Sequence, residues 1–154
     1  MRFEESFVVE APREVVWRFF EERGPDVGMC IPGAESVEET GEDRYRVRVT
    51  QKVGTIGATF DLKAEIKDRT PIDALDISAI GRSVKGARGD LRAKAAIALA
   101  PNGSGTQIDL VADLALGGML GSLGHKVIAQ KAAEVTREFA QALTKLIQDE
   151  SGGS

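Results

Sequence analysis

The last long segment of the chain carries an apolar residue at nearly every third or fourth position. From Gly117 to about Gln148 this stripe contains Leu120, Leu123, Val127, Ile128, Ala132, Val135, Phe139, Leu143 and Leu146. The spacing predicts one α-helix of about thirty residues with a single apolar face. Its first half is rich in glycine and alanine, and its second half carries the bulky side chains. We therefore expect the second half to seal a core. The first half either packs closely on a sheet or leaves a void beneath it.

Between Glu35 and Leu116 the apolar residues recur at every second position instead. The clearest run is Ile56–Ile66, where Ile, Ala, Phe and Leu alternate with polar residues. Such regular alternation predicts antiparallel strands with one buried and one solvated face. Turn residues divide the region into six strands, at Thr40-Gly41, Val53-Gly54, Thr70-Pro71, Gly81 to Gly86 and Pro101-Asn102-Gly103.

A strand and one or two short helices precede this region. Phe3–Val9 alternates and predicts the strand, Pro12 suits the first turn of a helix, and Val15–Phe20 has helical spacing. Gly24-Pro25 ends that helix, and a short irregular or helical piece follows up to Cys30–Gly33. A run of strands followed by a helix makes an α+β domain, here a curved antiparallel sheet wrapped around the long C-terminal helix. We expect one ligand-binding domain over residues 1–148 and a flexible tail over residues 149–154.

Composition narrows the class of protein. The chain has 154 residues, 42% of them hydrophobic and 29% charged, which is typical of a soluble globular domain with a real core. The net charge of −4 argues against nucleic-acid binding through a basic field. A single cysteine, Cys30, excludes an internal disulfide and suits a reducing cytoplasm. Met1–Glu5 does not resemble a signal peptide, and Leu114–Gly124 is about half the ~20 uncharged residues that a membrane span needs.

Few residues offer catalytic chemistry. One cysteine and one histidine, Cys30 and His125, argue against zinc, so we expect no metal site. A Cys30–His125 nucleophile pair is conceivable, but a packed cysteine and a solvated histidine are favoured. Glu5 is the one carboxylate whose position in the alternation places it on the core side of its strand. A pocket lined by aliphatic residues can hold an apolar ligand and provides little for catalysis, so we expect no catalytic residue.

The outward face of the sheet mixes basic and acidic residues, and such a face is usually just solvated. One basic loop, which contains Arg82, Lys85 and Arg88, is a candidate contact for an acidic partner or for anionic lipid head groups. Each charge near a membrane surface contributes only about 1 kcal/mol, which is too little for these three to anchor the protein alone.

Four motifs appear in a recognisable order. They are Cys30–Glu35, the Val53–Phe60 hairpin, the glycine-containing Gly81–Gly89 region and Gly117–Gly124. In this order they resemble the G-subunit family of carbon monoxide dehydrogenase, within the START-like (helix-grip, SRPBCC) superfamily. The resemblance covers roughly Met1 to Ile147.

This resemblance implies a non-enzymatic accessory protein of a carbon monoxide dehydrogenase-type molybdenum hydroxylase. It further implies that the protein binds a lipid-like molecule, such as menaquinone or another quinone, with no cofactor bound covalently. Such proteins are thought to link the enzyme to the membrane, so we expect a cytoplasmic protein with peripheral contact at the inner face of the cytoplasmic membrane. Membrane-attaching members often carry a further C-terminal segment, which does not follow the long helix here. We therefore do not expect this sequence to anchor directly.

The ligand is expected between sheet and helix, at the inward-facing positions of both. The predicted ligand-binding residues are Pro32, Val49, Phe60, Leu62, Ile77, Ala79, Leu116, Leu120, Leu123, Ile128 and Ala132. Two alternatives stay open at this point. One is a cyclase or hydrolase of the same fold acting on an aromatic substrate, which would need Glu5, Tyr45 or His125 in the pocket. The other is a ligand-free docking module.

Overall fold

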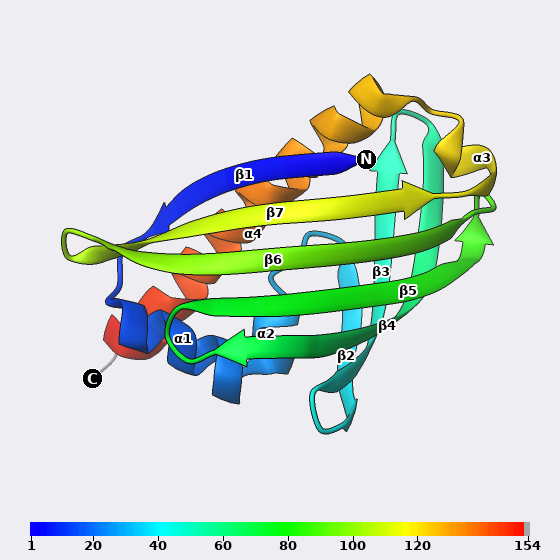
Figure 1. Ribbon diagram of the computed structural model, residues 1–154. Helices are drawn as coiled ribbons and strands as arrows, with labels where there is room; N and C mark the ends of the chain where they lie inside the picture. The colour runs from blue at the N-terminus through cyan, green and yellow to red at the C-terminus, as the bar shows by residue number, and fades with distance from the viewer. Residues whose placement is uncertain (153–154) are drawn as a thin grey trace.

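The computed structural model describes residues 1–152 and shows one sheet with helices packed on its inner face (Figure 1). The chain begins with β1 (Arg2–Val9), α1 (Arg13–Glu22) and α2 (Gly24–Gly28), and it ends with α3 (Gly118–Gly121) and α4 (His125–Gly152). Six strands lie between them: β2 (Ala34–Gly41), β3 (Arg44–Val53), β4 (Ile56–Thr70), β5 (Ala74–Gly86), β6 (Asp90–Asn102) and β7 (Gly105–Leu116). The predicted order of elements and the α+β helix-grip class are confirmed.

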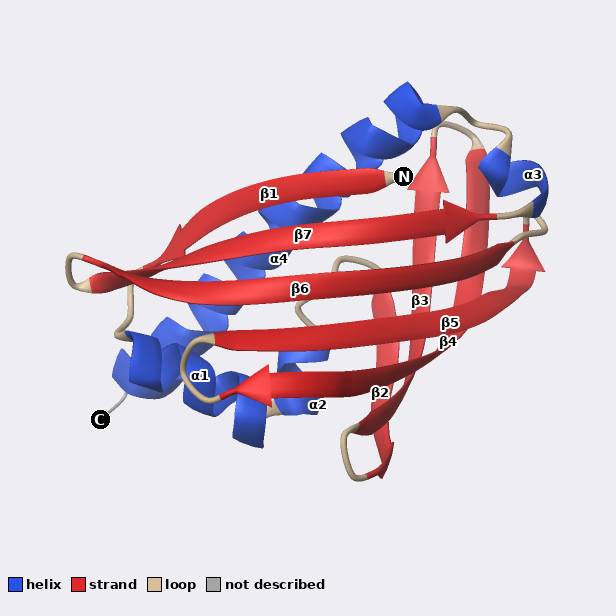
Figure 2. Cartoon of the chain, viewed as in Figure 1, coloured by secondary structure: helices blue, strands red, loops and turns tan. Residues whose placement is uncertain are grey.

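The sheet is antiparallel throughout and has the strand order β1-β7-β6-β5-β4-β3-β2. The long strand β4 joins its two parts. In Figure 2, β1, β7, β6 and β5 run side by side, whereas β3 and β2 cross their direction and α4 passes behind the sheet. Register shifts between β4 and β5 occur at Thr59/Phe60 and at Ile66/Asp68. Such irregularities bend a strand and increase its twist, which lets the sheet curve around α4.

The predicted continuous helix from Gly117 to Gln148 is wrong in its first quarter. The chain forms the short helix α3, turns at Ser122–Gly124 and then begins α4 at His125. Gly118 and Gly124 have φ values of 67° and 93°, a left-handed conformation that favours glycine. These two glycines therefore turn the chain and do not form a smooth helical face.

Two further boundaries differ from the prediction. The helix α4 continues past Gln148 to Gly152, so residues 149–152 are helical and not a tail, while residues 153–154 lie outside the described part of the chain. Strand β5 also continues through the predicted Gly81–Gly86 turn, and the connection to β6 comes at residues 87–89. A Cβ at Gly81 would contact the carbonyl oxygen of Asp61, so this glycine allows close approach of two strands and not a turn.

The buried side chains form two separate hydrophobic clusters. The larger one joins β1, α1 and the second half of α4, and it includes Val9, Val16, Leu143 and Ile147. The smaller one joins β3, β4 and α3 through Val47, Val49, Ala58, Phe60, Leu62 and Leu120. Leu143 is 0% exposed, which confirms that the second half of the helix seals a core.

Candidate functional site: a cavity between the two clusters

A cavity of about 320 Å³ lies where the two hydrophobic clusters meet. Phe7, Ile66, Ile77 and Phe139 on its walls pack against the larger cluster. Other wall residues belong to the smaller one or pack against it, namely Val37, Tyr45, Val47, Ala64 and Ile31. Phe20, Gly24, Val27, Gly28, Glu65, Leu75, Ile97, Ile108, Leu110, Val135 and Thr136 complete the walls. The space therefore interrupts what would otherwise be one continuous core.

The helix α4 forms one wall with Val135, Thr136 and Phe139. All three side chains are only partly buried, although they lie on the same helix as the fully buried Leu143 and Ile147. Phe139 meets Phe7 of β1 edge-on, with 6.2 Å between ring centroids. The helix thus packs tightly on the sheet at its C-terminal half and leaves space over the sheet one to two turns earlier.

The short helix α2 forms another wall, and two glycines set its distance from the sheet. A Cβ at Gly24 would lie 2.6 Å from the hydroxyl oxygen of Tyr45, and a Cβ at Gly28 would lie 3.0 Å from Val37. Both partners are wall residues of the cavity. Glycine at both positions lets the α2 backbone rest directly on β2 and β3.

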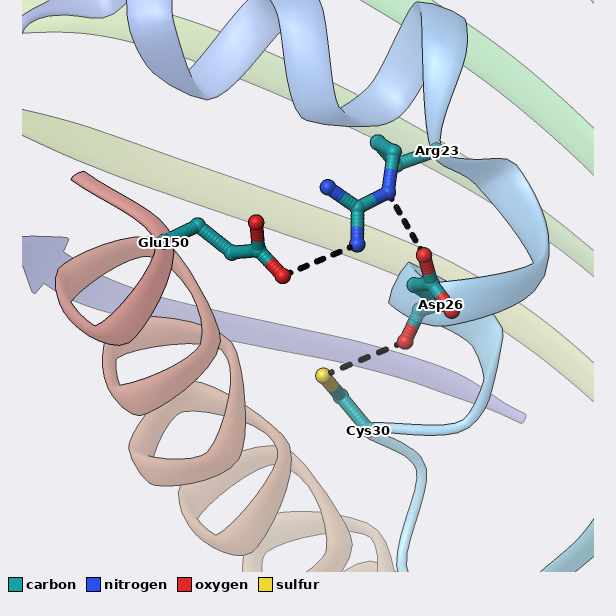
Figure 3. A network of polar contacts seen from close by, with 4 residues as sticks. All are labelled: Arg23, Asp26, Cys30 and Glu150. Carbon is teal, nitrogen blue, oxygen red and sulfur yellow. Dashed lines mark hydrogen bonds and ion pairs between the residues drawn. The ribbon is translucent and has the colours of Figure 1, made fainter. Parts of the chain in front are cut away.

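An ion-pair network holds α2 to the end of α4, as Figure 3 shows. Arg23 Nε lies 2.6 Å from Asp26 Oδ2, and Arg23 Nη2 lies 3.2 Å from Glu150 Oε1. The hydrogen bonds with Glu150 and then Asp26 raise the pKa of Arg23. Cys30 follows α2, with its thiol sulfur 3.5 Å from the carbonyl oxygen of Asp26. Burial raises the pKa of the Cys30 thiol, which keeps it protonated and unreactive.

Polar side chains are scarce on the cavity walls: Tyr45, Glu65 and Thr136 among twenty residues. The Thr136 hydroxyl donates to the carbonyl oxygen of Ala132 at 2.9 Å, and Glu65 Oε2 lies 3.3 Å from Lys67 Nζ. Burial, followed by the negative charges of Glu39 and Asp43, raises the pKa of Tyr45. The walls therefore offer one neutral phenol to a ligand and no paired acid and base.

Comparison with known proteins identifies the family. The family model for the G subunit of carbon monoxide dehydrogenase (CoxG) matches residues 6–148. The chain belongs to the CoxG family. Among curated proteins, none matches it.

Solved structures confirm the helix-grip fold of this CoxG-family chain. A conserved protein from Geobacillus kaustophilus is 23% identical, with a TM-score of 0.85 over 97% of this chain and 96% of that one. Ara h 8.0201 is 16% identical, with a TM-score of 0.69 over 97% and 98%. The Zhui aromatase/cyclase from Streptomyces sp. R1128 is 16% identical, with a TM-score of 0.63 over 96% and 93%.

At these levels of identity the likeness to the solved structures shows the fold alone. The family match adds the functional class, since CoxG is described as part of carbon monoxide dehydrogenase. CoxG membership and a START-like fold fit an accessory role in which a hydrophobic ligand is bound.

Of the predicted ligand-binding residues in this CoxG-family chain, Ile77 lines the cavity. The other ten do not line it, and their contact with a ligand stays a prediction. Val49, Phe60, Leu62 and Leu120 are buried in the smaller cluster, and Leu116 and Leu123 pack against it. Ile128 is buried, and Pro32, Ala79 and Ala132 are partly buried away from the walls.

The displacement has a physical reason. Alternation in the strands identifies the inward face, but it does not show where along that face the helix lifts away. The glycine-rich segment was expected to leave the space, yet it folds into α3, whose Leu120 fills the smaller cluster. The sequence analysis missed Val135 and Phe139 as wall residues because bulky side chains were expected to seal the core. Gly24 and Gly28, spaced one helical turn apart, were the signal that could have pointed to α2.

The other candidate residues lie apart from one another. Cys30 packs in the larger cluster with Leu143 and Ile147, whereas His125 begins α4 and stacks on Phe3 at 5.9 Å between ring centroids. The helix between those two ends has 28 residues, or roughly 40 Å at 1.5 Å per residue, which excludes a Cys30–His125 pair. Glu5 is partly buried on the inward face of β1, as its position in the alternation predicted, but it does not line the cavity.

Two further findings bear on function. Within residues 1–152, no helix is both long enough and apolar enough to cross a membrane. In the same part of the chain, no three His, Cys, Asp or Glu side chains gather in a way that could hold a metal ion.

Proposed function

We propose that this CoxG-family protein binds a hydrophobic small molecule, a quinone or another lipid, in the cavity between its two clusters. The observation that carries the proposal is the cavity itself: about 320 Å³ of space whose walls are apolar except for Tyr45, Glu65 and Thr136. An empty space of this kind deprives its lining atoms of dispersion contacts, which an apolar ligand restores.

The size of the cavity constrains the ligand. At about 320 Å³ it lies near the lower end of the ~300–1,000 Å³ range of small-molecule pockets. A quinone ring with a short side chain fits this range, whereas a chain of many isoprene units has to extend beyond the walls. Tyr45 would offer its phenol hydroxyl to a carbonyl oxygen of such a ring.

The partner is proposed on narrower grounds. We propose that the protein serves a carbon monoxide dehydrogenase-type molybdenum hydroxylase, and the CoxG family description supports this. We further propose that it links this enzyme to the inner face of the cytoplasmic membrane as a peripheral, cytoplasmic protein. In this role menaquinone or another quinone is a ligand held without a covalent bond.

A binding role is favoured over an enzymatic one. The Zhui aromatase/cyclase shares the fold, and Tyr45 lies on the cavity wall of this chain. However, the two other groups considered for a cyclase or hydrolase, Glu5 and His125, do not line the cavity. A phenol whose pKa is raised by burial is a poor base near neutral pH, and no second acid or base faces it across the cavity. A docking module without a ligand is disfavoured by the space itself.

The decisive experiment compares two valine variants of α4. Val135 lines the cavity and Val127 does not, although both are partly buried on the same helix. Val135→Phe should fill part of the cavity and weaken the binding of a short-chain quinone at least tenfold, as measured by titration calorimetry. Val127→Phe should bind like the original protein. Equal affinities in all three proteins, or no binding by any of them, would overturn the proposal.

The natural ligand is identified separately, by native mass spectrometry of the protein purified from its own host and by organic extraction. Recovery of a quinone or another lipid at close to one molecule per chain is the expected result. The partner is tested by co-purification of the molybdenum hydroxylase with the tagged protein from the same cells. If the hydroxylase does not co-purify, the proposed partner is wrong while the ligand proposal stands.

A further inference from the structure

A row of cationic side chains crosses the outer face of the sheet. The strand register places Arg46 of β3 beside Lys63 of β4, Lys63 beside Ile80 of β5, and Ile80 beside Arg92 of β6. Because alternate residues of a strand face opposite sides, these four side chains share the face that is turned away from α4 and the cavity. Ile80 is 50% exposed in the middle of the row. We call these four residues the cationic row.

The cationic row lacks the charge pairing of its neighbour. In the adjacent row, Arg48 and Arg82 flank Asp61, and Arg82 also faces Asp90. In the cationic row, Arg46 and Lys63 face each other directly, and like charges in that position destabilise a sheet. Arg46 is paired with Asp61 at 2.7 Å. Within residues 1–152, by contrast, Lys63 and Arg92 form no ion pair within 4.0 Å.

The row also stands out against the charge of the whole chain. The net charge is −4, so the excess of carboxylates lies elsewhere on the molecule. A hollow of about 200 Å³ adjoins the row and is lined by Ser36, Glu38, Arg46, Arg48 and Asp61. The outer face thus combines unpaired cations, a half-exposed aliphatic side chain and a place where a partner's side chain could be seated.

We propose that the cationic row is the docking surface for an acidic face of another protein. The partner's recognition element places carboxylates against Lys63 and Arg92 and an apolar side chain against Ile80 between them. Adjacent strands lie about 4.8 Å apart, so the two carboxylates are separated by roughly 10 Å. An apolar centre with a charged surround is the usual anatomy of a protein–protein interface, and arginine is enriched there.

A protein fits this face better than a lipid surface or a nucleic acid. Asp61 and Asp90 lie in the adjacent row, where a continuous layer of phosphates would meet them as well as the cations. A protein can present carboxylates to the cations alone and a donor to Asp61. The proposal does not depend on a ligand in the cavity, since the row lies on the opposite face of the sheet.

The test is site-specific photo-cross-linking in the native host, from a photoreactive residue at Ile80. The control position is Val8, which is 44% exposed on the outer face of β1 at the far side of the sheet. We expect a discrete protein adduct from Ile80 and none of the same mass from Val8. The cross-linked peptide of the partner, mapped by mass spectrometry, should carry two or more carboxylates beside an apolar residue.

Charge variants then test the role of the row. Lys63→Glu with Arg92→Glu should lower the adduct yield at least tenfold, and the milder Lys63→Gln with Arg92→Gln should lower it severalfold. The matched control, Arg137→Glu with Lys145→Glu on the exposed side of α4, makes the same change in net charge and should leave the yield unchanged. Circular dichroism confirms that each variant is folded.

Four results would overturn the proposal: no adduct from Ile80, an adduct with lipid or nucleic acid, an adduct with a second copy of this chain, or a protein adduct that the row variants leave intact. None of them bears on quinone binding in the cavity. The two proposals therefore fail separately.

Discussion

Filling the cavity from the sheet side should make the protein more stable. Ala64 of β4 lies on the cavity wall, and Ala64→Leu adds three carbons to a space of about 320 Å³. At about 0.8 kcal/mol for each buried CH₂, full burial would contribute roughly 2 kcal/mol. Ordering the leucine side chain costs about 0.5–1 kcal/mol, so we expect a net gain of about 1–2 kcal/mol. For a domain of this size, that gain raises Tm by about 2–8 °C.

A second alanine on the same strand and the same face provides the control. Ala58 is buried in the smaller cluster and does not line the cavity. Ala58→Leu should therefore force its neighbours apart and cost about 1–3 kcal/mol. Both variants are measured by urea unfolding of the ligand-free protein, followed by the fluorescence of Trp17, the one tryptophan. A loss of stability in Ala64→Leu equal to that in Ala58→Leu would show that the space beside Ala64 is not available.

Three other outcomes are expected. Leu143→Ala, at a position that is 0% exposed, should cost about 2–5 kcal/mol in the same unfolding assay, and a smaller loss would mean that α4 seals the core less tightly than the structure shows. Tyr45 is the one tyrosine, and because burial raises its folded-state pKa, its phenolate absorbance should appear above the ordinary pKa of about 10. The unfolded chain loses that proton first, so stability should fall as pH rises through this range, and Tyr45→Phe should remove that part of the fall. Cys30 should react with iodoacetamide at neutral pH only at the rate of unfolding, whereas prompt alkylation of the folded protein would contradict its burial.

The fold could be predicted because its signals are local and repeated. Alternation over a dozen residues identifies a strand such as β6 and its buried face at once, and the order of strands and helices then leaves few architectures. Boundaries were less predictable where glycine was concerned. Gly81 allows β5 to approach β4, and Gly118 turns the chain into α3, but both looked like ordinary turn or helix residues in the sequence.

The cavity could be predicted only in kind. An apolar inward face indicated an apolar pocket, and Ile77 was placed correctly on its wall. Its position depends on how far α4 stands from the sheet near Val135, which is set by the tight packing of Leu143 and by α2 resting on the sheet through Gly28. Such distances arise from contacts between segments far apart in the chain, and no periodic pattern records them.

Strand β4 presents the two proposed sites on its two faces. Ala64 lines the cavity, and its neighbour Lys63 belongs to the cationic row on the opposite side. The two side chains do not share a packing environment, so their substitutions should act independently unless the backbone of β4 itself has two arrangements. If a ligand that fills the cavity shifts this strand, it must change the affinity of a partner on the outer face. The partner must then change the affinity of the ligand by the same factor. Partner binding by Ala64→Leu, in which the cavity is permanently part-filled, therefore distinguishes two separate sites from a coupled pair.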